Sequence, residues 1–551
     1  MQDSDAGAAA QMARPWLGLY QQGIGSEASE GEDMLSLFRQ TVASDGRMNA
    51  LLYFDKATDY CTLDRQSEAF GAWLAGRGVG RGNRVIVIAQ NIPAFSVGVV
   101  AAWKLGAVPI PLNPMYRAAE LARIFADAAP SAVLCQASDQ DEVARGLERG
   151  GLSHVAIAVA SPHIGQTLDD PVLPAREPAR RGDDLEAIYA AHAGASLPDP
   201  GVTPDILGLI LYTSGTTGVP KGAMLSHRAL ASNARFLERW CHIDHTSRIL
   251  AIAPFFHITG LVCHLCAAIS ARCPMILNYR FDPRVVADMI RRWQPSFTIG
   301  AITAFNALSQ HKDLTAADMA CLKSVYSGGA PIPPALKQEI EQLLGIVVHP
   351  SYGMTETAAP AIFSPFGADV PVLDGALSIG VPTPGTLVRV LADDGTIAPP
   401  GVAGEICMRG PNVMQGYWNK PEETAEALRD GWMHSGDVGI MDEQGWVYLV
   451  DRKKDVIIAS GFKVWPREVE DVLYAHPAVR EAAVIGVPDA YRGETVKAVV
   501  SLKAGASATH EDLVAHCREN LAAYKTPRLI EFLDDLPKTV SGKIQRAALR
   551  G

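Results

Sequence analysis

A short segment of hydroxyl residues and glycines directly follows an apolar run in this chain. The stretch LILYTSGTTGVPKGAMLSH occupies residues 209–227, and Lys221 follows its loop. Small side chains let backbone N–H groups approach a phosphate closely, and a lysine adds positive charge. Pro220 stands where a Walker A loop needs its second glycine, so this is not that motif. The segment predicts a phosphate-binding loop of another kind; a plain Ser/Thr/Gly turn is the alternative if it stood alone.

Three further segments carry side chains that suit a nucleotide. SYGMTET supplies Tyr352, which can stack on a base, and Glu356, a carboxylate of the kind that Mg²⁺ binds together with phosphate oxygens. HSGDVG places Asp437 in a tight turn, where it can accept hydrogen bonds from ribose hydroxyls. PKTVSGKIQR places Lys543 on a glycine-containing loop near the C-terminus. Each signal alone is weak, but all of them point to one chemistry.

The bulk properties restrict the class of protein. The chain has 551 residues, a net charge of −11, 48% hydrophobic and 20% charged residues, and nine cysteines. This length predicts two or more domains, and the negative charge argues against nucleic acid as a partner. The cysteines suggest reduced thiols in the cytoplasm. The N-terminus is acidic, and the apolar region 84–113 is interrupted by polar residues, so we expect neither a signal peptide nor an integral membrane segment.

The chemistry-bearing segments must be held by a scaffold, and the sequence predicts an α/β fold. Residues 84–91 and 108–113 are typical of buried parallel strands, and 94–107 of the helix between them. This alternation favours a large N-terminal domain of mostly parallel sheets packed with helices. The proline-rich residues 161–205 predict a surface excursion. After Asp451 strands and helices alternate on a smaller scale, which suits a separate small α+β domain.

Taken together and in this order, the motifs resemble the adenylate-forming superfamily of acyl-CoA synthetases, luciferases and peptide-synthetase adenylation domains. YTSGTTGVPKG resembles the family's phosphate loop, YSGGAPI its loop against the adenine, and YGMTE its adenine, α-phosphate and magnesium segment. PFFHITG is similar to the segment beside the acyl pocket. WMHSGD and DRKKDVIIASGFKVWPREVE resemble the ribose contact and the interdomain hinge. The resemblance covers nearly the whole chain and is greatest to fatty-acyl-CoA ligases.

The resemblance implies a ligase that uses ATP and Mg²⁺ to form an acyl-AMP and then transfers the acyl group to coenzyme A. Lys543 would bridge the substrate carboxylate and the phosphate, where its charge offsets the repulsion of two anions. Thr355 would hold an α-phosphate oxygen, Glu356 would bind Mg²⁺, and His257 would lie beside the acyl group. The implied ATP-binding residues are Thr213, Ser214, Gly215, Thr216, Thr217 and Lys221 at the phosphates, Gly329, Ala330 and Tyr352 at the adenine, and Asp437 and Arg452 at the ribose.

The resemblance also implies a mobile lid. We expect an N-terminal AMP-binding domain of residues 1–453 and a C-terminal lid of residues 454–551, which rotates about Lys454 between the two half-reactions. Rotation would withdraw Lys543 and bring another loop of the lid to the pantetheine arm. The implied coenzyme A residues are Ser460, Gly461 and Lys463.

Several alternatives stay open at this stage. The chain could load an acyl-AMP onto a carrier protein in trans instead of coenzyme A. Oxidative luminescence is disfavoured because Ile458 stands where luciferases carry a lysine used in the thioester step. A noncatalytic nucleotide sensor is disfavoured because it would not need Lys543. The spacing of Cys263 and Cys266 is that of half a zinc site, but a second ligand pair is missing, so we interpret both as core residues.

The acid substrate and the protein partners are less well determined by the sequence. The segments expected to line the acyl pocket, 257–262, 300–305 and 326–332, are mostly apolar and lack an obvious cation for a second carboxylate. They favour an apolar monocarboxylic acid: a medium- or long-chain fatty acid first, an aryl or phenylpropenoid acid second. A homodimer stays open. A lysine acetyltransferase acting on Lys543 is a further expected partner, because acetylation would remove the charge that the first half-reaction needs.

Overall fold

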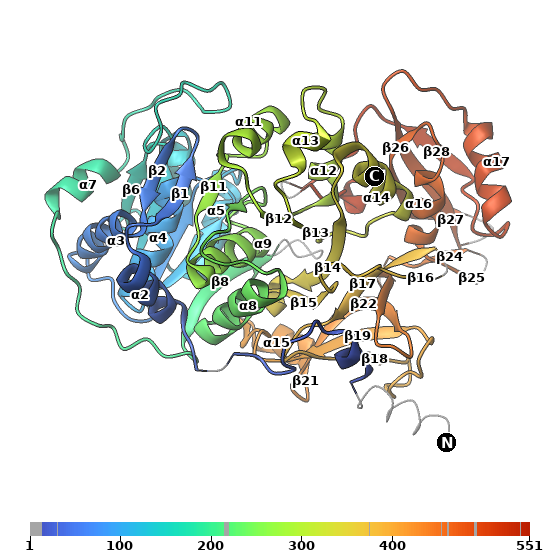
Figure 1. Ribbon diagram of the computed structural model, residues 1–551, viewed down its shortest axis with the longest axis horizontal. Coiled ribbons are helices and arrows are strands. Elements are labelled where there is room, and N and C mark those ends of the chain that lie inside the picture. Colours follow the sequence, from blue (N-terminus) through green and yellow to red (C-terminus); the bar gives the residue numbers. More distant parts are fainter. Residues whose placement is uncertain are drawn as a thin grey trace.

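A computed structural model describes residues 14–29, 31–213, 220–373, 375–452, 455–459, 462–489, 493–539 and 542–550. Within these residues the chain forms four β-sheets with helices packed between and around them (Figure 1). Three sheets are built from residues before 453, and the fourth from residues after 456. The mixed α/β class that the sequence predicts is confirmed.

The first sheet is parallel throughout. Apart from the two-residue β7, its strands are buried and mostly apolar runs, as expected when helices cover both faces. The expected strand–helix–strand unit is present: α4 (Pro93–Lys104) connects the two strands predicted at 84–91 and 108–113. The sheet has the strand order β4 (Val108–Leu112), β3 (Arg84–Ile88), β5 (Ala132–Gln136), β6 (Ala156–Ala160) and β7 (Asp183–Asp184).

The largest sheet is parallel in its middle and antiparallel at both ends, where one end is the single pair β1–β2. Two short strands, β16 (Val372–Leu373) and β21 (Leu428–Arg429), pair at its margin with β17 and β22. The remaining strands follow the order β18 (Leu387–Leu391), β19 (Gly404–Arg409), β22 (Trp432–Met441), β23 (Val447–Arg452), β17 (Ala376–Pro382), β15 (Ala359–Phe363), β14 (Val348–Met354), β13 (Ser324–Ser327), β12 (Phe297–Gly300), β10 (Ile249–Leu250), β11 (Met275–Leu277), β1 (Asn49–Tyr53) and β2 (Lys56–Asp59).

A small antiparallel sheet carries the flanks of the predicted phosphate loop. It consists of β8 (Leu207–Thr213), β9 (Lys221–Ser226) and β20 (Gly416–Tyr417). Helix α8 (His227–Trp240) begins directly after β9, where the hydroxyl of Ser226 accepts a hydrogen bond from the amide N–H of Ala229 at 3.1 Å. This N-cap fixes the start of the helix, and the buried side of α8 packs into the main core.

The fourth sheet contains the C-terminal residues. Its strands are β25 (Phe462–Val464), β24 (Ile457–Ala459), β27 (Gly493–Leu502), β26 (Val479–Asp489) and β28 (Leu529–Phe532). Helices α16 (Pro466–Tyr474) and α17 (His510–Asn520) cover it and share a separate small core. Figure 1 shows this unit at one end of the molecule, next to α14 (Pro334–Leu344).

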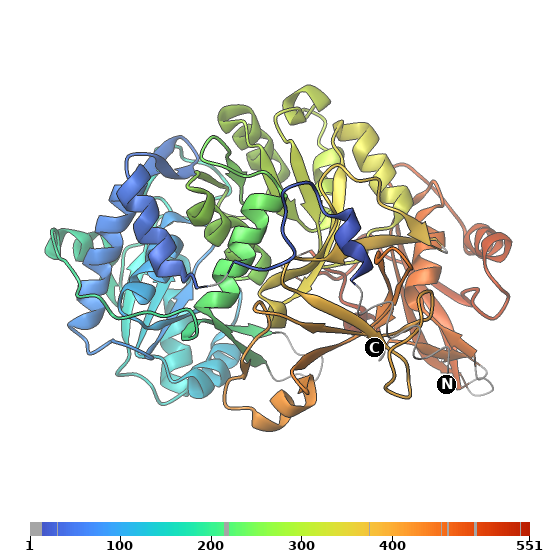
Figure 2. The same cartoon turned by 60° about the horizontal axis from the view of Figure 1, so that its bottom comes forward.

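The other helices surround the N-terminal sheets. They are α2 (Met34–Asp45), α3 (Tyr60–Ala75), α5 (Ala118–Ala128), α6 (Gln140–Arg149), α7 (Leu185–Ala191), α9 (Ile258–Gly260), α10 (Ala267–Ala271), α11 (Pro283–Trp293), α12 (Ile302–Ser309), α13 (Ala316–Met319) and α15 (Pro421–Ala427). The proline-rich residues 161–205 contain only β7 and α7, in agreement with the predicted excursion. The turned view of Figure 2 shows residues 14–29 (dark blue) running across the sheets, where Tyr20 donates a hydrogen bond to the carbonyl of Pro382. No helix among the described ranges is long and apolar enough to cross a membrane.

The Cys263–Cys266 segment is part of the core. It forms a π-helical turn, η3 (Leu261–Cys266), and both cysteine side chains are fully buried. His264, between them, uses its Nε2 in a 3.1 Å hydrogen bond with the carbonyl of Ile299. The core interpretation of these cysteines is therefore confirmed.

Candidate functional site

Three neighbouring parallel strands end at the same edge of the large sheet. β12 ends at Gly300, β13 at Ser327, and β14 carries Tyr352 near its end. Open α/β sheets bind ligands outside the carboxyl ends of such strands. Gly329 and Ala330 follow β13 directly, so both predicted adenine residues lie at this edge with Tyr352. The sheet topology therefore brings together segments that are far apart in the sequence.

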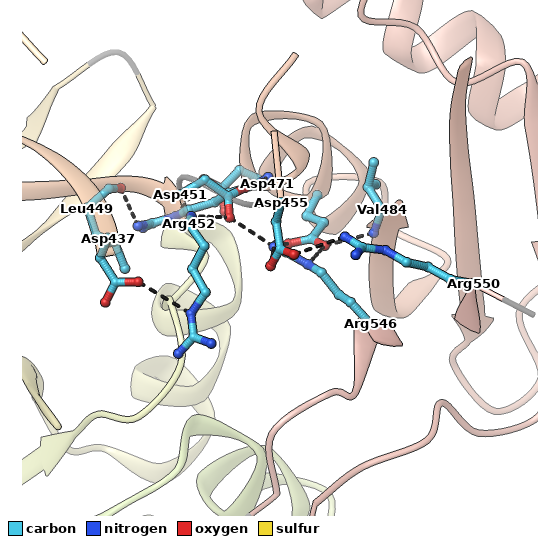
Figure 3. A network of polar contacts seen from close by, with 11 residues as sticks. Asp437, Leu449, Asp451, Arg452, Asp455, Asp471, Val484, Arg546 and Arg550 are labelled. Carbon is cyan, nitrogen blue, oxygen red and sulfur yellow. Dashed lines mark hydrogen bonds and ion pairs between the residues drawn. The ribbon is translucent and has the colours of Figure 1, made fainter. Parts of the chain in front are cut away.

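Asp437 is held by two side chains at the middle of this edge. The hydroxyl of Tyr352 donates to Asp437 Oδ2 at 2.7 Å, and Arg452 Nε lies 3.3 Å from Asp437 Oδ1. Asp437 and Arg452 are directly opposed on β22 and β23, which explains their pairing (Figure 3). Burial raises the pKa of Asp437, and Arg452, Tyr352 and Lys543 oppose that shift. The arrangement can present a carboxylate to ribose hydroxyls beside an aromatic ring.

Asp437 lies within β22 and not in the tight turn that the sequence predicted, and this part of the strand is supported from the neighbouring β19. Glu405 Oε1 accepts a hydrogen bond from the amide N–H of Gly436 at 3.1 Å, and the Ser435 hydroxyl donates to the carbonyl of Ile406 at 2.6 Å. Within the described part of the chain, the one group of three side chains spaced closely enough for a metal ion is Glu405, Cys407 and His434, which lies on the same two strands. We interpret it as part of this support.

Lys543 reaches from the C-terminal unit into the same site. Its pKa is lowered by burial and by the charge of Arg452, whereas the nearby carboxylates Asp437 and Glu356 raise it. A Cβ atom on Gly329 would lie 3.1 Å from Lys543 Cε, so the lysine passes directly over the predicted adenine loop. The Thr303 hydroxyl donates to the carbonyl of Gly542 at 3.2 Å and thereby fixes the loop that presents the lysine.

His257 faces the same lysine from the loop after β10. Burial, together with the positive charge of Lys543, lowers its pKa to about 3. The imidazole is therefore neutral at physiological pH. Its Nδ1 accepts a hydrogen bond from the amide N–H of Thr259 at 3.3 Å, which leaves the proton on Nε2. His257 can donate a hydrogen bond to an oxygen of a ligand without adding charge.

Glu356 lies in the 3₁₀ turn η4 (Thr355–Thr357) that follows β14. It is 7% exposed, its Oε1 accepts a hydrogen bond from the Tyr417 hydroxyl at 2.7 Å, and burial raises its pKa. The Lys221 ammonium lies 5.3 Å from the centre of the Tyr417 ring. Tyr417 thus contacts both Glu356 and Lys221, the lysine of the predicted phosphate loop. Thr355 begins the same turn and is half-buried.

The structure positions both flanks of the predicted phosphate loop. Thr213 and Lys221 are opposed in the β8–β9 hairpin, and the Thr213 hydroxyl donates to the carbonyl of Lys221 at 3.4 Å. The predicted residues Ser214, Gly215, Thr216 and Thr217 lie outside the described residues, as do Lys454, Ser460 and Gly461. Lys463, predicted to meet coenzyme A, lies on the exposed face of β25, with Nζ 3.7 Å from Asp393.

Tyr417 and Asn91 were missed by the sequence reasoning, and Thr303, although it lies in the predicted pocket segment 300–305, was not expected to contact the Lys543 loop. Thr303 binds the loop that carries Lys543, and Tyr417 binds Glu356. Asn91 is buried, and its side chain donates to the carbonyls of Ala251 and Ala253 and accepts from the amide N–H of Phe255 at 2.8 Å. It thus fixes the loop that leads to His257. The only signal for Asn91 was a polar residue at the end of a buried strand.

The family models agree with this site. Residues 38–418 match the model described as AMP-binding enzyme, and residues 468–543 match the AMP-binding enzyme C-terminal domain. The first match alone covers more than half of the chain. The chain belongs to the AMP-binding enzyme family, and the resemblance predicted from its motifs is confirmed.

Similar proteins give the class of reaction. A long-chain-fatty-acid–CoA ligase of Bacillus subtilis (strain 168) is 34% identical over 555 residues, with 98% of each chain covered. A feruloyl-CoA synthase of Amycolatopsis is 36% identical over 494 residues, covering 90% of this chain and 94% of the relative. These relatives confirm the predicted class: the chain is an AMP-forming acyl-CoA synthetase, for which ATP and coenzyme A are substrates.

The solved structure of ATP-bound MatB from Rhodopseudomonas palustris has the same fold. It is 32% identical, covers 94% of this chain and 98% of its own, and has a TM-score of 0.83. The apo form of MatB, with equal coverage, has a TM-score of 0.75. The arrangement of this chain is thus more similar to the ATP-bound form, in agreement with the position of Lys543 inside the site.

Proposed function

We propose that this chain activates a long-chain fatty acid and that the roles of its site residues are those implied by the motifs. The observation that carries the proposal is the convergence of Lys543, Asp437 and Glu356 at the carboxyl edge of the sheet, with Tyr352 beside them. The fatty-acid substrate is supported by the name of the Bacillus relative over its full length. The mostly apolar segments 257–262, 300–305 and 326–332 suit an apolar acid.

In the first half-reaction a carboxylate oxygen attacks the α-phosphorus of ATP. A new O–P bond forms, the bond to the β-phosphate oxygen breaks, and pyrophosphate leaves. Lys543 places its charge between the two anions, and Asp437 and Arg452 hold the ribose. Gly329 and Ala330 line the adenine, Thr355 holds the α-phosphate, and the 213–221 hairpin loop binds the β- and γ-phosphates. Neutral His257 donates a hydrogen bond from Nε2 toward the substrate carboxylate.

Glu356 suits the Mg²⁺ ion that accompanies ATP. A single buried carboxylate beside a phosphate-binding lysine is the donor set that Mg²⁺ accepts, because the ion takes its remaining ligands from phosphate oxygens and water. The Tyr417 hydrogen bond occupies Oε1, which directs Oε2 to a ligand. When bound, the ion would supply positive charge at the phosphates.

In the second half-reaction the thiol sulfur of coenzyme A attacks the acyl carbon. A C–S bond forms, the bond from the acyl carbon to the AMP oxygen breaks, and AMP leaves. We assign residues 1–453 to the AMP-binding domain and 454–551 to a lid that turns about Lys454 between the steps. The loop with Ser460 and Gly461 would then contact the pantetheine arm. Lys463 is exposed on this lid and is available to a coenzyme A phosphate.

A phenylpropenoid acid is the second candidate substrate. The feruloyl-CoA synthase relative is slightly more identical to this chain than the fatty-acid ligase, although over a shorter length. An acyl carrier protein is the alternative thiol acceptor. Competition at saturating ATP separates these options: hexadecanoate, dodecanoate, hexanoate, benzoate and ferulate are offered together with coenzyme A, and the thioesters are separated by mass.

The outcomes of the competition are distinct. We expect hexadecanoyl- or dodecanoyl-CoA to dominate. Dominant feruloyl-CoA would replace the fatty-acid proposal with the second candidate. Formation of acyl-AMP and pyrophosphate with a fatty acid, but of thioester and AMP only after a carrier protein is added, would overturn coenzyme A as the acceptor.

Two finer proposals concern the cellular setting. The nine cysteines are all free thiols, which suits the cytoplasm. Acetylation of Lys543 by a lysine acetyltransferase would remove its positive charge and stop the first half-reaction. We expect the modification to occur when the lid is turned away, because the lysine is half-buried against Gly329 in the present arrangement.

A further inference from the structure

Arg546, three residues after Lys543, lies at the centre of a network of buried charges (Figure 3). Its Nε and Nη2 bind the two carboxylate oxygens of Glu470 at 2.9 and 2.6 Å. Its Nη1 lies 2.9 Å from Asp451 Oδ1 and 3.6 Å from Asp455 Oδ2. One guanidinium therefore contacts three carboxylates, and its side chain is only 18% exposed.

The Glu470 contact lies within the C-terminal unit. Glu470 is on α16, and its Oε1 also accepts a hydrogen bond from the amide N–H of Val484 on β26 at 2.7 Å. A bidentate arginine–carboxylate pair fixes both distance and orientation. The pair thus anchors the end of the Lys543 loop to the body of the unit.

The Asp451 contact crosses to the other unit. Asp451 lies on β23, which belongs to the large N-terminal sheet, and its side chain is 4% exposed. Its Oδ2 accepts a hydrogen bond from the amide N–H of Arg467 at 2.9 Å. The Arg467 side chain in turn donates to the carbonyl of Leu449 on the same strand at 2.5 Å. Two arginines of the C-terminal unit therefore bind the last strand before the expected hinge.

These contacts are specific to one orientation of the two units. Asp451 and Arg546 lie on opposite sides of residues 453–454, about which the lid is proposed to rotate. A rotation there would separate the guanidinium from Asp451, whereas the Arg546–Glu470 pair would travel with the lid intact. Of the three carboxylate contacts of Arg546, the Asp451 contact is therefore the one that depends on the orientation of the lid.

We propose that Asp451 and Arg546 form a latch that holds the lid in the orientation of the first half-reaction and thereby positions Lys543. The inference rests on the proposed function, since it assigns the latch to adenylation. It concerns positioning only: neither residue of the latch is among those proposed to bind the substrates. When Asp451 loses its charge, a smaller fraction of the molecules has the lid in the adenylating orientation. The rate of acyl-AMP formation falls in proportion to that fraction.

The test compares the two half-reactions in D451N. This variant keeps an oxygen that can accept the Arg467 hydrogen bond, so the local structure is retained while the charge is removed. We expect acid-dependent ATP–pyrophosphate exchange to fall about tenfold. Thioester formation from supplied acyl-AMP and coenzyme A, which does not need Lys543, should stay within about twofold of the wild-type rate or increase.

D455N is the matched control. Asp455 contacts the same arginine, but it lies on the lid side of the hinge and also pairs with Arg550 at 2.9 Å. Its loss should leave the ratio of the two half-reactions unchanged. R546K, which keeps the charge but not the bidentate geometry, should resemble D451N. Thermal unfolding of each variant checks its folding.

Three results would overturn the latch: equal rates in D451N and the wild type, an equal fall of both half-reactions, or the same split in D455N as in D451N. A wild-type chain that shows no acid-dependent exchange would instead refute the proposed function. The two failures are therefore distinguishable in one set of assays.

Discussion

Lys543 Cε lies so close to Gly329 that a Cβ atom on the glycine would be 3.1 Å from it. The lysine comes from the C-terminal unit and the glycine from the loop after β13 of the large sheet. Gly329 also has a φ of +83°, a conformation that side-chain-bearing residues rarely adopt. The glycine therefore serves both the turn of the proposed adenine loop and the passage of the lysine beside it.

Gly329→Ala tests this closeness. The added methyl group must displace Lys543, and the positive φ costs roughly 1–2 kcal/mol in addition. We expect acyl-AMP formation to fall about tenfold or more. Gly367→Ala is a matched control: Gly367 has a φ of +75° but no atom near its Cβ position, so it isolates backbone strain. A G329A enzyme no slower than G367A in exchange assays would contradict the proposed position of the lysine.

Lys543→Gln tests the charge itself. Because the amide cannot offset the repulsion between carboxylate and phosphate, pyrophosphate exchange should fall by about 10²–10³-fold. Thioester formation from supplied acyl-AMP should persist. Lys538→Gln on the same segment is the control, since Lys538 pairs with Asp535 and Glu481 away from the site. Retained exchange in K543Q would remove the lysine from the mechanism.

Tyr352→Phe tests the ribose clamp. The ring remains for the adenine, but Asp437 loses a 2.7 Å hydrogen bond and is less well oriented. A net loss of about 1 kcal/mol corresponds to a rise of roughly fivefold in KM for ATP, with kcat changed little. Tyr448→Phe removes the similar Tyr448–Asp442 hydrogen bond on β23 and should leave KM unaltered. Equal KM values for Y352F and Y448F would argue against a role for this hydroxyl in ATP binding.

His264 predicts how stability depends on pH. Burial lowers its pKa from 6.5 to about 3. Below pH 6.5 the unfolded chain takes up a proton that the folded chain does not, so stability is lost as the pH falls from 6.5 toward 3. At pH 5 the loss from this group is about 2 kcal/mol. Urea unfolding of wild type and His264→Gln at pH 7 and pH 5 measures it. The variant should lose less stability between the two pH values, and identical losses would refute the prediction.

The sequence could predict the architecture because its signals were local. The apolar runs at 84–91 and 108–113 are each long enough to indicate a buried strand, and the segment 94–107 between them is long enough for a helix. The shorter alternation of strands and helices after Asp451 corresponds to a separate sheet that begins at Ile457. The exact boundary at Lys453/Lys454 stays a prediction, because both residues lie outside the described ranges.

The site was predictable to the extent that its motifs are contiguous. Tyr352, Asp437 and Lys543 were expected from three short segments, and the structure brings them together. The contacts of Tyr417 and Thr303 could not be found in this way, because each is a single hydrogen bond to a residue distant in sequence. The same holds for the Asp451–Arg546 ion pair, whose partners are 95 positions apart.

The most direct test of the central claim follows oxygen from the acid into AMP. Hexadecanoate labelled with ¹⁸O in its carboxylate is incubated with the enzyme, ATP and coenzyme A, and the AMP and phosphate products are examined by mass spectrometry. An acyl-AMP intermediate leaves one ¹⁸O atom in AMP, because the acyl C–O bond breaks when the thiol attacks. Label in inorganic phosphate, with ADP as the nucleotide product, would contradict adenylation at this site.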